Sequence, residues 1–179
     1  MLNTHDTLVL IVDVQEKLMP AMSARGELIA NCQKLIRGAR ALGVPVLCTE
    51  QNPKGLGPTV PDIAGLLPGP APAVKFSFSC AGCEEFMGQL SRAARRNVLI
   101  AGIETHVCVY QTALDLRSRG FHVEVAADAC DSRRPADKQI GLEKCRDAGV
   151  GISCVETALF ELLKVAEGPV FKEIVKIVK

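Results

Sequence analysis

Tryptophan is absent from the 179-residue sequence, tyrosine occurs once, and aromatic residues make up 4% of the chain. Proteins that bind single-stranded nucleic acid commonly stack successive bases on aromatic rings, and this chain has few rings to offer. Charge of one sign is not in excess either, because 21 lysines and arginines stand against 20 aspartates and glutamates, a net charge of +1. Such a chain has no net field that collects polyanions. We therefore expect no nucleic acid partner.

Long apolar runs are missing as well. The longest run near the start, Leu8 to Val12, is far shorter than the roughly 20 residues that span a bilayer. The first residues show neither a basic region ahead of an apolar stretch nor a small-residue cleavage site, the features of a secretory signal. These observations predict a cytoplasmic protein with no membrane partner.

Cysteine, in contrast, is abundant. Eight cysteines occur, at positions 32, 48, 80, 83, 108, 130, 145 and 154. In a small exported protein they would indicate a disulfide framework. However, 179 residues with 48% hydrophobic content are enough for one domain with a substantial core. We interpret the cysteines as mostly free thiols in a single domain over residues 1–179.

Apolar runs alternate along the chain with segments of helical periodicity, a pattern typical of α/β proteins. The runs predict strands over residues 7–14, 44–49, 73–76, 97–103, 121–127 and 150–154. The periodicity predicts helices over 28–42, 82–95, 107–119, 136–148 and 156–165. We expect a three-layer Rossmann-like fold, with a six-stranded parallel sheet of order 3-2-1-4-5-6 and helices on both faces.

Two segments lie outside this alternation. Residues 50–72 are rich in glycine and proline, and we expect them to form the longest irregular segment of the chain. Long loops in compact domains are usually functional or disordered, and this one carries Glu50 and Gln51 near a strand end. The amphipathic segment 171–178 can serve either as a subunit contact or as a helix that docks on the chain's own core.

Side chains with chemical potential follow the predicted strands. In an open parallel sheet, ligands bind beyond the carboxyl ends of the strands, where the connections change face. The first strand ends in Asp13, the third ends at Lys75, and Cys108 lies in the first turn of the helix after the fourth. We expect these three residues to converge at one edge of the sheet.

An acid, an amine and a thiol in one place can carry out nucleophilic catalysis. A helix N-terminus and a nearby lysine lower a cysteine pKa from about 8.5, so we expect a lowered pKa for Cys108. Asp13 can take the thiol proton and return it to a leaving group, and backbone N–H groups around Glu104 and Cys108 can hold an oxyanion. The same residue types also occur as a turn carboxylate, a small core thiol and a solvated lysine at a strand edge. The apolar neighbours of Lys75 argue instead for a half-buried lysine.

Four blocks of sequence resemble a known family. They are LVLIVDVQ at 8–15, VKFSF at 74–78, VLIAGIETHVCVYQTALDL at 98–116 and GFHVEVAADACDSR at 120–133. The chain resembles the isochorismatase-like cysteine hydrolase superfamily, which includes nicotinamidases and N-carbamoylsarcosine amidohydrolase. The segments EQNPKGLGPTVP at 50–61 and FKEI at 171–174 are most similar to the isochorismatase domain-containing protein branch, whose substrate is poorly defined.

The resemblance implies a catalytic triad of Asp13, Lys75 and Cys108, and a cis peptide bond between Ile103 and Glu104. It also implies a homo-oligomer, because members of the family often assemble. Nicotinamidases carry an Asp-x-His metal motif after the second strand, whereas this segment has no histidine, and no aspartate before Asp62. We therefore expect no metal site, and no feature of the sequence indicates a cofactor.

Further residues are candidates for the wall of a substrate pocket: Gln15, Glu50, Gln51, His106 and Tyr110. For His106 a structural role and a substrate-facing role both remain open. We expect Glu104 to contribute mainly its backbone. Cys80 and Cys83 form a lone C-x-x-C, which fits either local thiol packing or a redox pair.

The sequence thus predicts a cofactor-independent cysteine hydrolase. It would act on a small amide-like or ester-like substrate through a thioester intermediate. Three alternatives remain: a non-catalytic binding or interaction protein on the same fold, a thiol redox protein, and a true isochorismatase that cleaves a vinyl ether. The family's vinyl-ether enzymes lack the nucleophilic cysteine that Cys108 would supply, which disfavours the last alternative.

Overall fold

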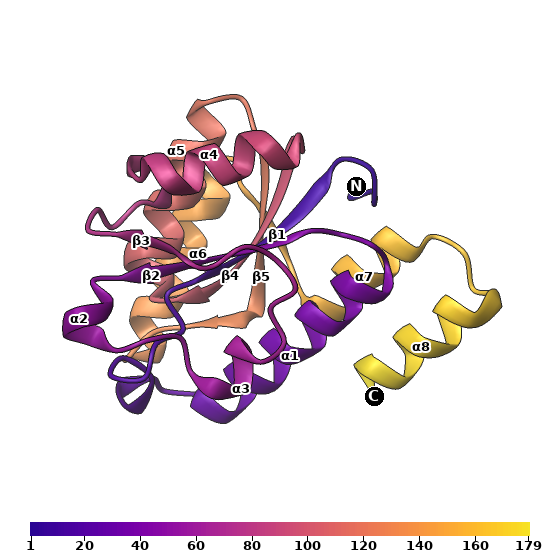
Figure 1. Ribbon diagram of the computed structural model, residues 1–179, viewed down its shortest axis with the longest axis horizontal. Coiled ribbons are helices and arrows are strands. Elements are labelled where there is room, and N and C mark those ends of the chain that lie inside the picture. Colours follow the sequence, from indigo (N-terminus) through magenta and orange to yellow (C-terminus); the bar gives the residue numbers. More distant parts are fainter.

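The computed structural model describes residues 1–179, and its centre is one six-stranded sheet (Figure 1). The strands are β1 (Thr7–Val12), β2 (Val46–Gln51), β3 (Ala73–Lys75), β4 (Asn97–Ile103), β5 (His122–Asp131) and β6 (Gly151–Ser153). Their order is β3-β2-β1-β4-β5-β6, and every neighbouring pair is parallel. The α/β class and the predicted strand order are confirmed.

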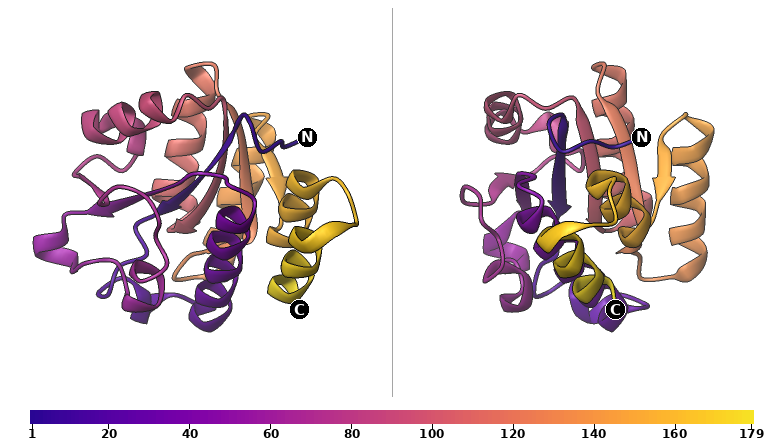
Figure 2. Two further views of the ribbon diagram at one scale, coloured as in Figure 1. Left: turned by 45° about the vertical axis from the view of Figure 1, so that its right-hand side comes forward. Right: turned by 90° about the vertical axis from the view of Figure 1, so that its right-hand side faces the viewer.

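Helices cover both faces of the sheet (Figures 1 and 2). On one face lie α1 (Arg25–Ala41), α7 (Val155–Leu163) and α8 (Gly168–Val178); on the other lie α4 (Glu84–Ala93), α5 (Tyr110–Ser118) and α6 (Pro135–Asp147). In β1, Val9 and Ile11 pack toward α1, whereas Leu8, Leu10 and Val12 pack toward α4 and α5. A strand buried on both faces needs an unbroken apolar run, which explains the pattern in the sequence.

The segment 50–72 differs from the expectation of an irregular loop, because it contains two short helices. They are α2 (Pro53–Leu56) and α3 (Pro61–Ala64). Each begins with a proline, which is well suited to the first turn of a helix because that turn needs no backbone N–H from it. Ile63 of α3 is fully buried and anchors the segment to the core. The prolines that predicted an irregular segment therefore begin two short helices instead.

Three other short elements were not predicted, and several boundaries differ from the expected ones. Two 3-10 helices, η1 (Met19–Ala21) and η2 (Cys80–Gly82), lie in connections, and a π-helical turn, η3 (Thr105–Val109), precedes α5. Strand β5 continues to Asp131, four residues beyond the expected end, with an irregularity in its pairing beside Gly102. The polar residue Asp128 interrupts the apolar run and hides this extension in the sequence.

The C-terminal helix α8 docks on the chain's own core, one of its two predicted roles. Ile174 is fully buried, and Lys34 of α1 donates a hydrogen bond to the carbonyl of Val178 at 2.8 Å.

All eight cysteines are free thiols, and seven of them are buried. None of the helices combines the length and the apolar character that crossing a bilayer requires.

Candidate active site

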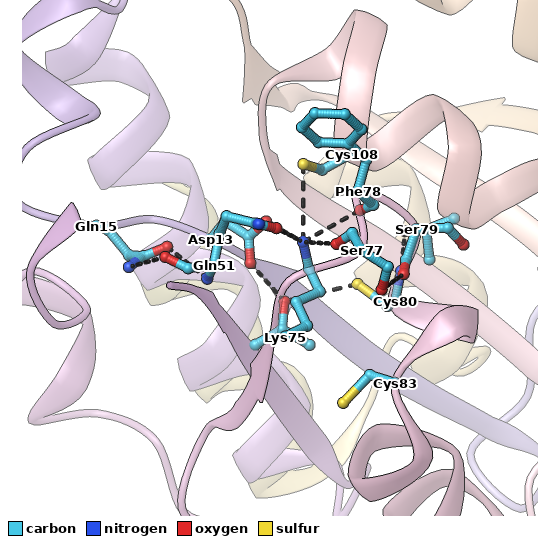
Figure 3. Close-up of polar contacts among 12 residues, drawn as sticks. Asp13, Gln15, Gln51, Lys75, Ser77, Phe78, Ser79, Cys80, Cys83 and Cys108 are labelled. Carbon is cyan, nitrogen blue, oxygen red and sulfur yellow. Dashed lines mark hydrogen bonds and ion pairs between the residues drawn. The ribbon is translucent and has the colours of Figure 1, made fainter. Parts of the chain in front are cut away.

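Three chain segments meet at the carboxyl edge of the sheet. Asp13 directly follows β1, Lys75 is the last residue of β3, and Cys108 lies in η3, which follows β4. Strand β1 has β4 on one side and β2, with β3 beyond it, on the other. The structure therefore brings together the three residues that the sequence placed at this edge (Figure 3).

Lys75 is the hub of the cluster. Its Nζ lies 2.6 Å from Asp13 Oδ2 and 3.7 Å from Cys108 Sγ, and it donates to Gln51 Oε1 at 2.7 Å. The carbonyls of Ser77 and Phe78 each lie 3.1 Å from the same nitrogen. The side chain is fully buried, so the prediction of a half-buried lysine is wrong. A buried ammonium needs this many partners because it has lost its hydration.

The Asp13 carboxylate is buried beside Lys75, and its two oxygens have different partners. Oδ1 accepts a hydrogen bond from Thr49 Oγ1 at 2.8 Å. Beyond the ion pair with Lys75, Oδ2 has no hydrogen-bond partner. One oxygen is thus fixed by β2, while the other keeps a lone pair that can accept a proton.

The pKa values of the cluster have clear causes. Burial on its own would lower the pKa of Lys75, but the Asp13 carboxylate more than offsets this, and the pKa is raised. Burial raises the pKa of the Cys108 thiol to about 12, and Asp13 adds to the rise while Lys75 opposes it. The expected lowering of the Cys108 pKa is therefore wrong. Cys108 lies as a thiol beside the Asp13–Lys75 ion pair.

The two candidate glutamines tie the neighbouring loops together. Gln15 is fully buried, and its amide donates to the carbonyls of Gln51 and Gly57 and accepts from the Gln51 N–H. Gln51 accepts from Lys75 and donates to the carbonyl of Phe76 at 2.9 Å. Gln15 therefore holds the segment after β1 against the end of β2, and Gln51 orients the lysine.

The remaining wall candidates lie outside the contacts of Lys75. Glu50 accepts two hydrogen bonds from Thr59, from its N–H at 2.6 Å and its hydroxyl at 2.7 Å, and so fixes the segment 50–72. His106 lies 3.0 Å from the hydroxyl of Ser132. The Lys144 Nζ lies over the Tyr110 ring, 5.1 Å from the ring centroid. The contacts of these three side chains are structural ones.

The Glu104 side chain forms an ion pair, while the contribution of its backbone to the site stays a prediction. The Ile103–Glu104 peptide bond is cis, as the resemblance implied. The buried Glu104 carboxylate accepts hydrogen bonds from the Arg133 guanidinium, the shortest at 2.6 Å, and from the Arg133 N–H at 2.9 Å. Burial would raise the pKa of Glu104, but the bonds from Arg133 lower it. Arg133 was not singled out from the sequence, although it ends the last block of the family resemblance.

The C-x-x-C cysteines show no disulfide and no shared partner. Cys80 Sγ lies 3.6 Å from Thr49 Oγ1, and burial raises the pKa of Cys80 to about 11. Cys83 donates to the carbonyl of Val74 at 3.4 Å. This geometry fits the local-packing interpretation. No group of three or more His, Cys, Asp or Glu side chains in the molecule is arranged to hold a metal ion.

Comparison with known proteins agrees with this geometry. The isochorismatase domain model matches residues 7–157. Isochorismatase domain-containing protein 1 of Danio rerio is 42% identical over 171 residues, which cover 93% of this chain and 59% of that protein. The chain therefore spans about three fifths of the length of that relative.

Two solved structures share the whole fold. MAR1 ribonuclease from Caenorhabditis elegans superposes with a TM-score of 0.92 at 34% identity, over 99% of this chain and 91% of that one. YcaC from Pseudomonas aeruginosa, solved with hexane-2,5-diol and covalent acrylamide, superposes with a TM-score of 0.91 at 25% identity, over 98% of this chain and 90% of that one. With its family match, strand order and sequence identity, the chain belongs to the isochorismatase domain family.

Proposed function

We propose that this protein is a cysteine-dependent hydrolase of a small amide-like or ester-like substrate, with Cys108 as nucleophile and Asp13 as proton carrier. One observation carries the proposal. A single buried ammonium, Lys75 Nζ, lies 2.6 Å from the carboxylate and 3.7 Å from the thiol, and the three side chains come from the carboxyl ends of three different strands or the residues that follow them. Burying a charged pair beside a thiol is costly for stability, so a purely structural role explains it poorly.

The first half of the reaction forms a thioester. Asp13 Oδ2 takes the Cys108 proton while the sulfur attacks the substrate carbonyl carbon, so that a C–S bond forms and the carbonyl oxygen becomes negative. Backbone N–H groups at Glu104 and Cys108 stabilise this oxyanion. When the carbonyl reforms, the bond to the amine or alcohol breaks, and Asp13 returns the proton to the leaving group.

The second half restores the enzyme. A water molecule gives a proton to Asp13 and adds to the thioester carbonyl. The C–S bond then breaks, the acid product leaves, and the proton on Asp13 returns to the Cys108 sulfur. Lys75 keeps its proton throughout, because its raised pKa favours the charged form. Its role is to hold the carboxylate and to stabilise negative charge on the sulfur.

A resting thiol is compatible with this cycle. With a pKa of about 12, Cys108 is protonated at neutral pH, so proton transfer must accompany the attack rather than precede it. The free lone pair on Asp13 Oδ2 is the acceptor that such a transfer needs. The arrangement keeps the thiol unreactive toward solvent until a carbonyl group is bound.

The surface beside the triad favours a substrate with an apolar portion. Phe76 and Phe78 flank Ser77, whose carbonyl accepts from Lys75, and their side chains are 75% and 57% exposed. Figure 3 shows the Phe78 ring in the immediate surroundings of the triad. Exposed aromatic rings next to a buried polar cluster are typical of small-molecule sites.

Covalent chemistry in a relative supports a nucleophile. The Pseudomonas aeruginosa YcaC structure holds covalent acrylamide, and acrylamide is an electrophile that thiols add to. The Caenorhabditis elegans relative is described as a ribonuclease, so an RNA oligonucleotide belongs in the substrate panel beside amides and esters.

The experiment is a hydrolysis screen with p-nitrophenyl esters and small amides on the wild-type protein and on Cys108→Ala. We expect at least a thousandfold loss of kcat/KM in Cys108→Ala and an acyl mass on Cys108 when a slow ester is trapped at low pH. Cys145→Ala, a change of another buried cysteine, is the matched control and should keep full activity.

The same screen separates the alternatives. Full activity in Cys108→Ala would refute the proposal. Tight ligand binding without turnover in the wild type would favour a binding protein, and turnover of a vinyl ether would favour isochorismatase chemistry. If a variant that lacks both Cys80 and Cys83 loses a redox-dependent response, the thiol redox interpretation gains support.

A further inference from the structure

A sizeable cavity of the molecule lies away from the triad, at the amino edge of the sheet. It has a volume of about 690 Å³, within the range of small-molecule sites. Its wall consists of the turn between α1 and β2 at residues 43–45, the start of β2, the segment 68–70 and the end of α4. None of the residues of the triad contributes to it.

The fold leaves this edge open because β3 is short. Strand β3 pairs with β2 only at Thr49, Glu50 and Gln51, so the first half of β2 has no neighbouring strand on its outer side. The segment 68–70 passes close to this half, since a Cβ atom on Gly69 would come within 2.5 Å of the Val46 carbonyl oxygen. Helices α1 and α4 close the space from opposite faces of the sheet (Figure 1).

The wall is strongly positive. It carries Arg40, Arg92 and Arg95, and no aspartate or glutamate is among its residues. None of the ion pairs of the molecule involves these arginines. Arg40 and Arg92 lie in the last turns of their helices, where a positive charge favours the helix dipole, but Arg95 lies beyond the end of α4, where that explanation does not apply.

Two buried polar atoms at this site lack a partner. Gln89 is 6% exposed; its Nε2 donates to the Ala71 carbonyl at 3.1 Å, but its Oε1 accepts no hydrogen bond. The Nε of Arg95 is also buried and donates none. Buried polar groups in folded proteins are nearly always paired, so an unpaired acceptor and an unpaired donor in one cavity wall indicate a ligand that supplies both partners.

We propose that this cavity binds a phosphate group, carried by a metabolite-sized phosphomonoester or present as free phosphate. A phosphomonoester has a charge of about −1.5 to −2 at neutral pH and several acceptor oxygens, which match the planar donor forks of Arg92 and Arg95. Gln89 Oε1 accepts from a hydroxyl or amino group of the same ligand. The apolar surfaces of Pro45, Pro68 and Leu47 accommodate the rest of the molecule.

This site is independent of the proposed hydrolase chemistry. It lies at the opposite end of the strands and shares no residue with Asp13, Lys75 or Cys108. Binding is therefore measured on the Cys108→Ala protein, where a failure of the hydrolase proposal does not affect the result. A failure to bind phosphate likewise says nothing about hydrolysis.

Isothermal titration calorimetry with AMP, inorganic phosphate and adenosine distinguishes the two sources of the phosphate group. AMP offers a phosphomonoester together with hydroxyl and amino donors. Inorganic phosphate offers only the anion, and adenosine only the hydroxyl and amino donors. We expect AMP to bind at a single site below 1 mM, and adenosine at least tenfold more weakly. Inorganic phosphate that binds as tightly as AMP would assign the site to free phosphate.

Variants locate the binding. The double change Arg92→Gln and Arg95→Gln should raise the Kd for AMP at least tenfold, because it removes both unpaired guanidinium groups. Arg146→Gln, a change of another exposed arginine near the end of α6, is the matched control and should alter the Kd less than twofold. The proposal is overturned if neither AMP nor phosphate binds below 10 mM, if the double variant binds normally, or if the control loses binding equally.

Discussion

At the carboxyl edge of the sheet, Lys75 and Asp13 are buried together, and each charge is matched by the other. At the amino edge, Arg40, Arg92 and Arg95 face a cavity whose wall holds no carboxylate. The first arrangement is close to neutral and fully packed, whereas the second is open and positive. A buried charge needs a partner of opposite charge, so Lys75 and Asp13 at the carboxyl edge are committed to each other. The arginines at the amino edge have no such partner and are available to a ligand.

This contrast predicts different responses to mutation. A change within the paired cluster leaves a buried charge without its partner, and stability and chemistry suffer together. A change of an exposed arginine removes attraction for a ligand and leaves the fold intact. The following predictions test that division, beginning with the largest expected effect.

Lys75→Met tests whether the paired edge is needed for folding. The variant leaves Asp13 buried without its cation, and we expect the free energy of unfolding to fall by about 3–5 kcal/mol. Urea denaturation followed by circular dichroism measures the loss. Lys172→Met, on the exposed side of α8, is the control and should change stability by less than about 0.5 kcal/mol. Asp13→Asn added to Lys75→Met should recover part of the loss, and a double variant no better than the single one would contradict this account.

A pair of glycine substitutions separates the two edges by function. A Cβ atom at Gly141 of α6 would lie 2.8 Å from the Cα of His106, in the turn that carries Cys108. Gly141→Ala should therefore lower stability by about 1–3 kcal/mol and, by displacing that turn, reduce kcat/KM at least tenfold. Gly69→Ala, which meets the Val46 carbonyl instead, should leave kcat/KM within twofold and weaken AMP binding. Equal effects of the two variants on hydrolysis would show that the edges are not separate.

The reactivity of Cys108 tests the electrostatics within the paired edge. Asp13 raises the pKa of the thiol and Lys75 opposes the rise. Asp13→Asn should therefore speed iodoacetamide alkylation of Cys108 about tenfold at pH 8, and Lys75→Met should slow it. In the wild type, the rate should increase throughout pH 7–10 without a plateau, since the pKa is about 12. Peptide mass spectrometry measures the alkylation rate of Cys108. A rate that reaches a plateau near pH 7 would show that the thiolate forms in the resting protein.

The sequence predicts the strands and the convergence of Asp13, Lys75 and Cys108 because both depend on local pattern and order. Six apolar runs of the right length fix the sheet, and residues at the ends of three strands must meet once the strand order is known. The direction of the Cys108 pKa was not predictable in this way. It depends on how deeply the thiol is buried and on the nearby Asp13, which raises the pKa of the thiol and so opposes the effect of Lys75.

Contacts between distant residues were also missed. The Glu104–Arg133 pair joins positions 29 residues apart, and nothing in the spacing of the two residues indicates that they meet. The amino-edge cavity depends on where β3 begins relative to β2, a register that the sequence alone does not reveal. The short helices in the segment 50–72 were missed because proline marks both the interruption of a strand and the start of a helix.

The Glu104–Arg133 pair gives the smallest predicted effect, because the Arg133 side chain is 60% exposed and water screens its charge. Arg133→Ala should cost about 1 kcal/mol of stability at pH 7, and Arg134→Ala, its exposed neighbour, less than about 0.5 kcal/mol. The pKa of Glu104 is lowered in the folded protein, so the stabilisation is complete above the ordinary value of 4.5 and is lost as the pH falls through the folded value. Unfolding curves of wild type and Arg133→Ala should therefore differ at pH 7 and converge once the pH has fallen below the folded value. A difference that persists in acid, where Glu104 is protonated, would mean that Arg133 acts through packing rather than through the carboxylate.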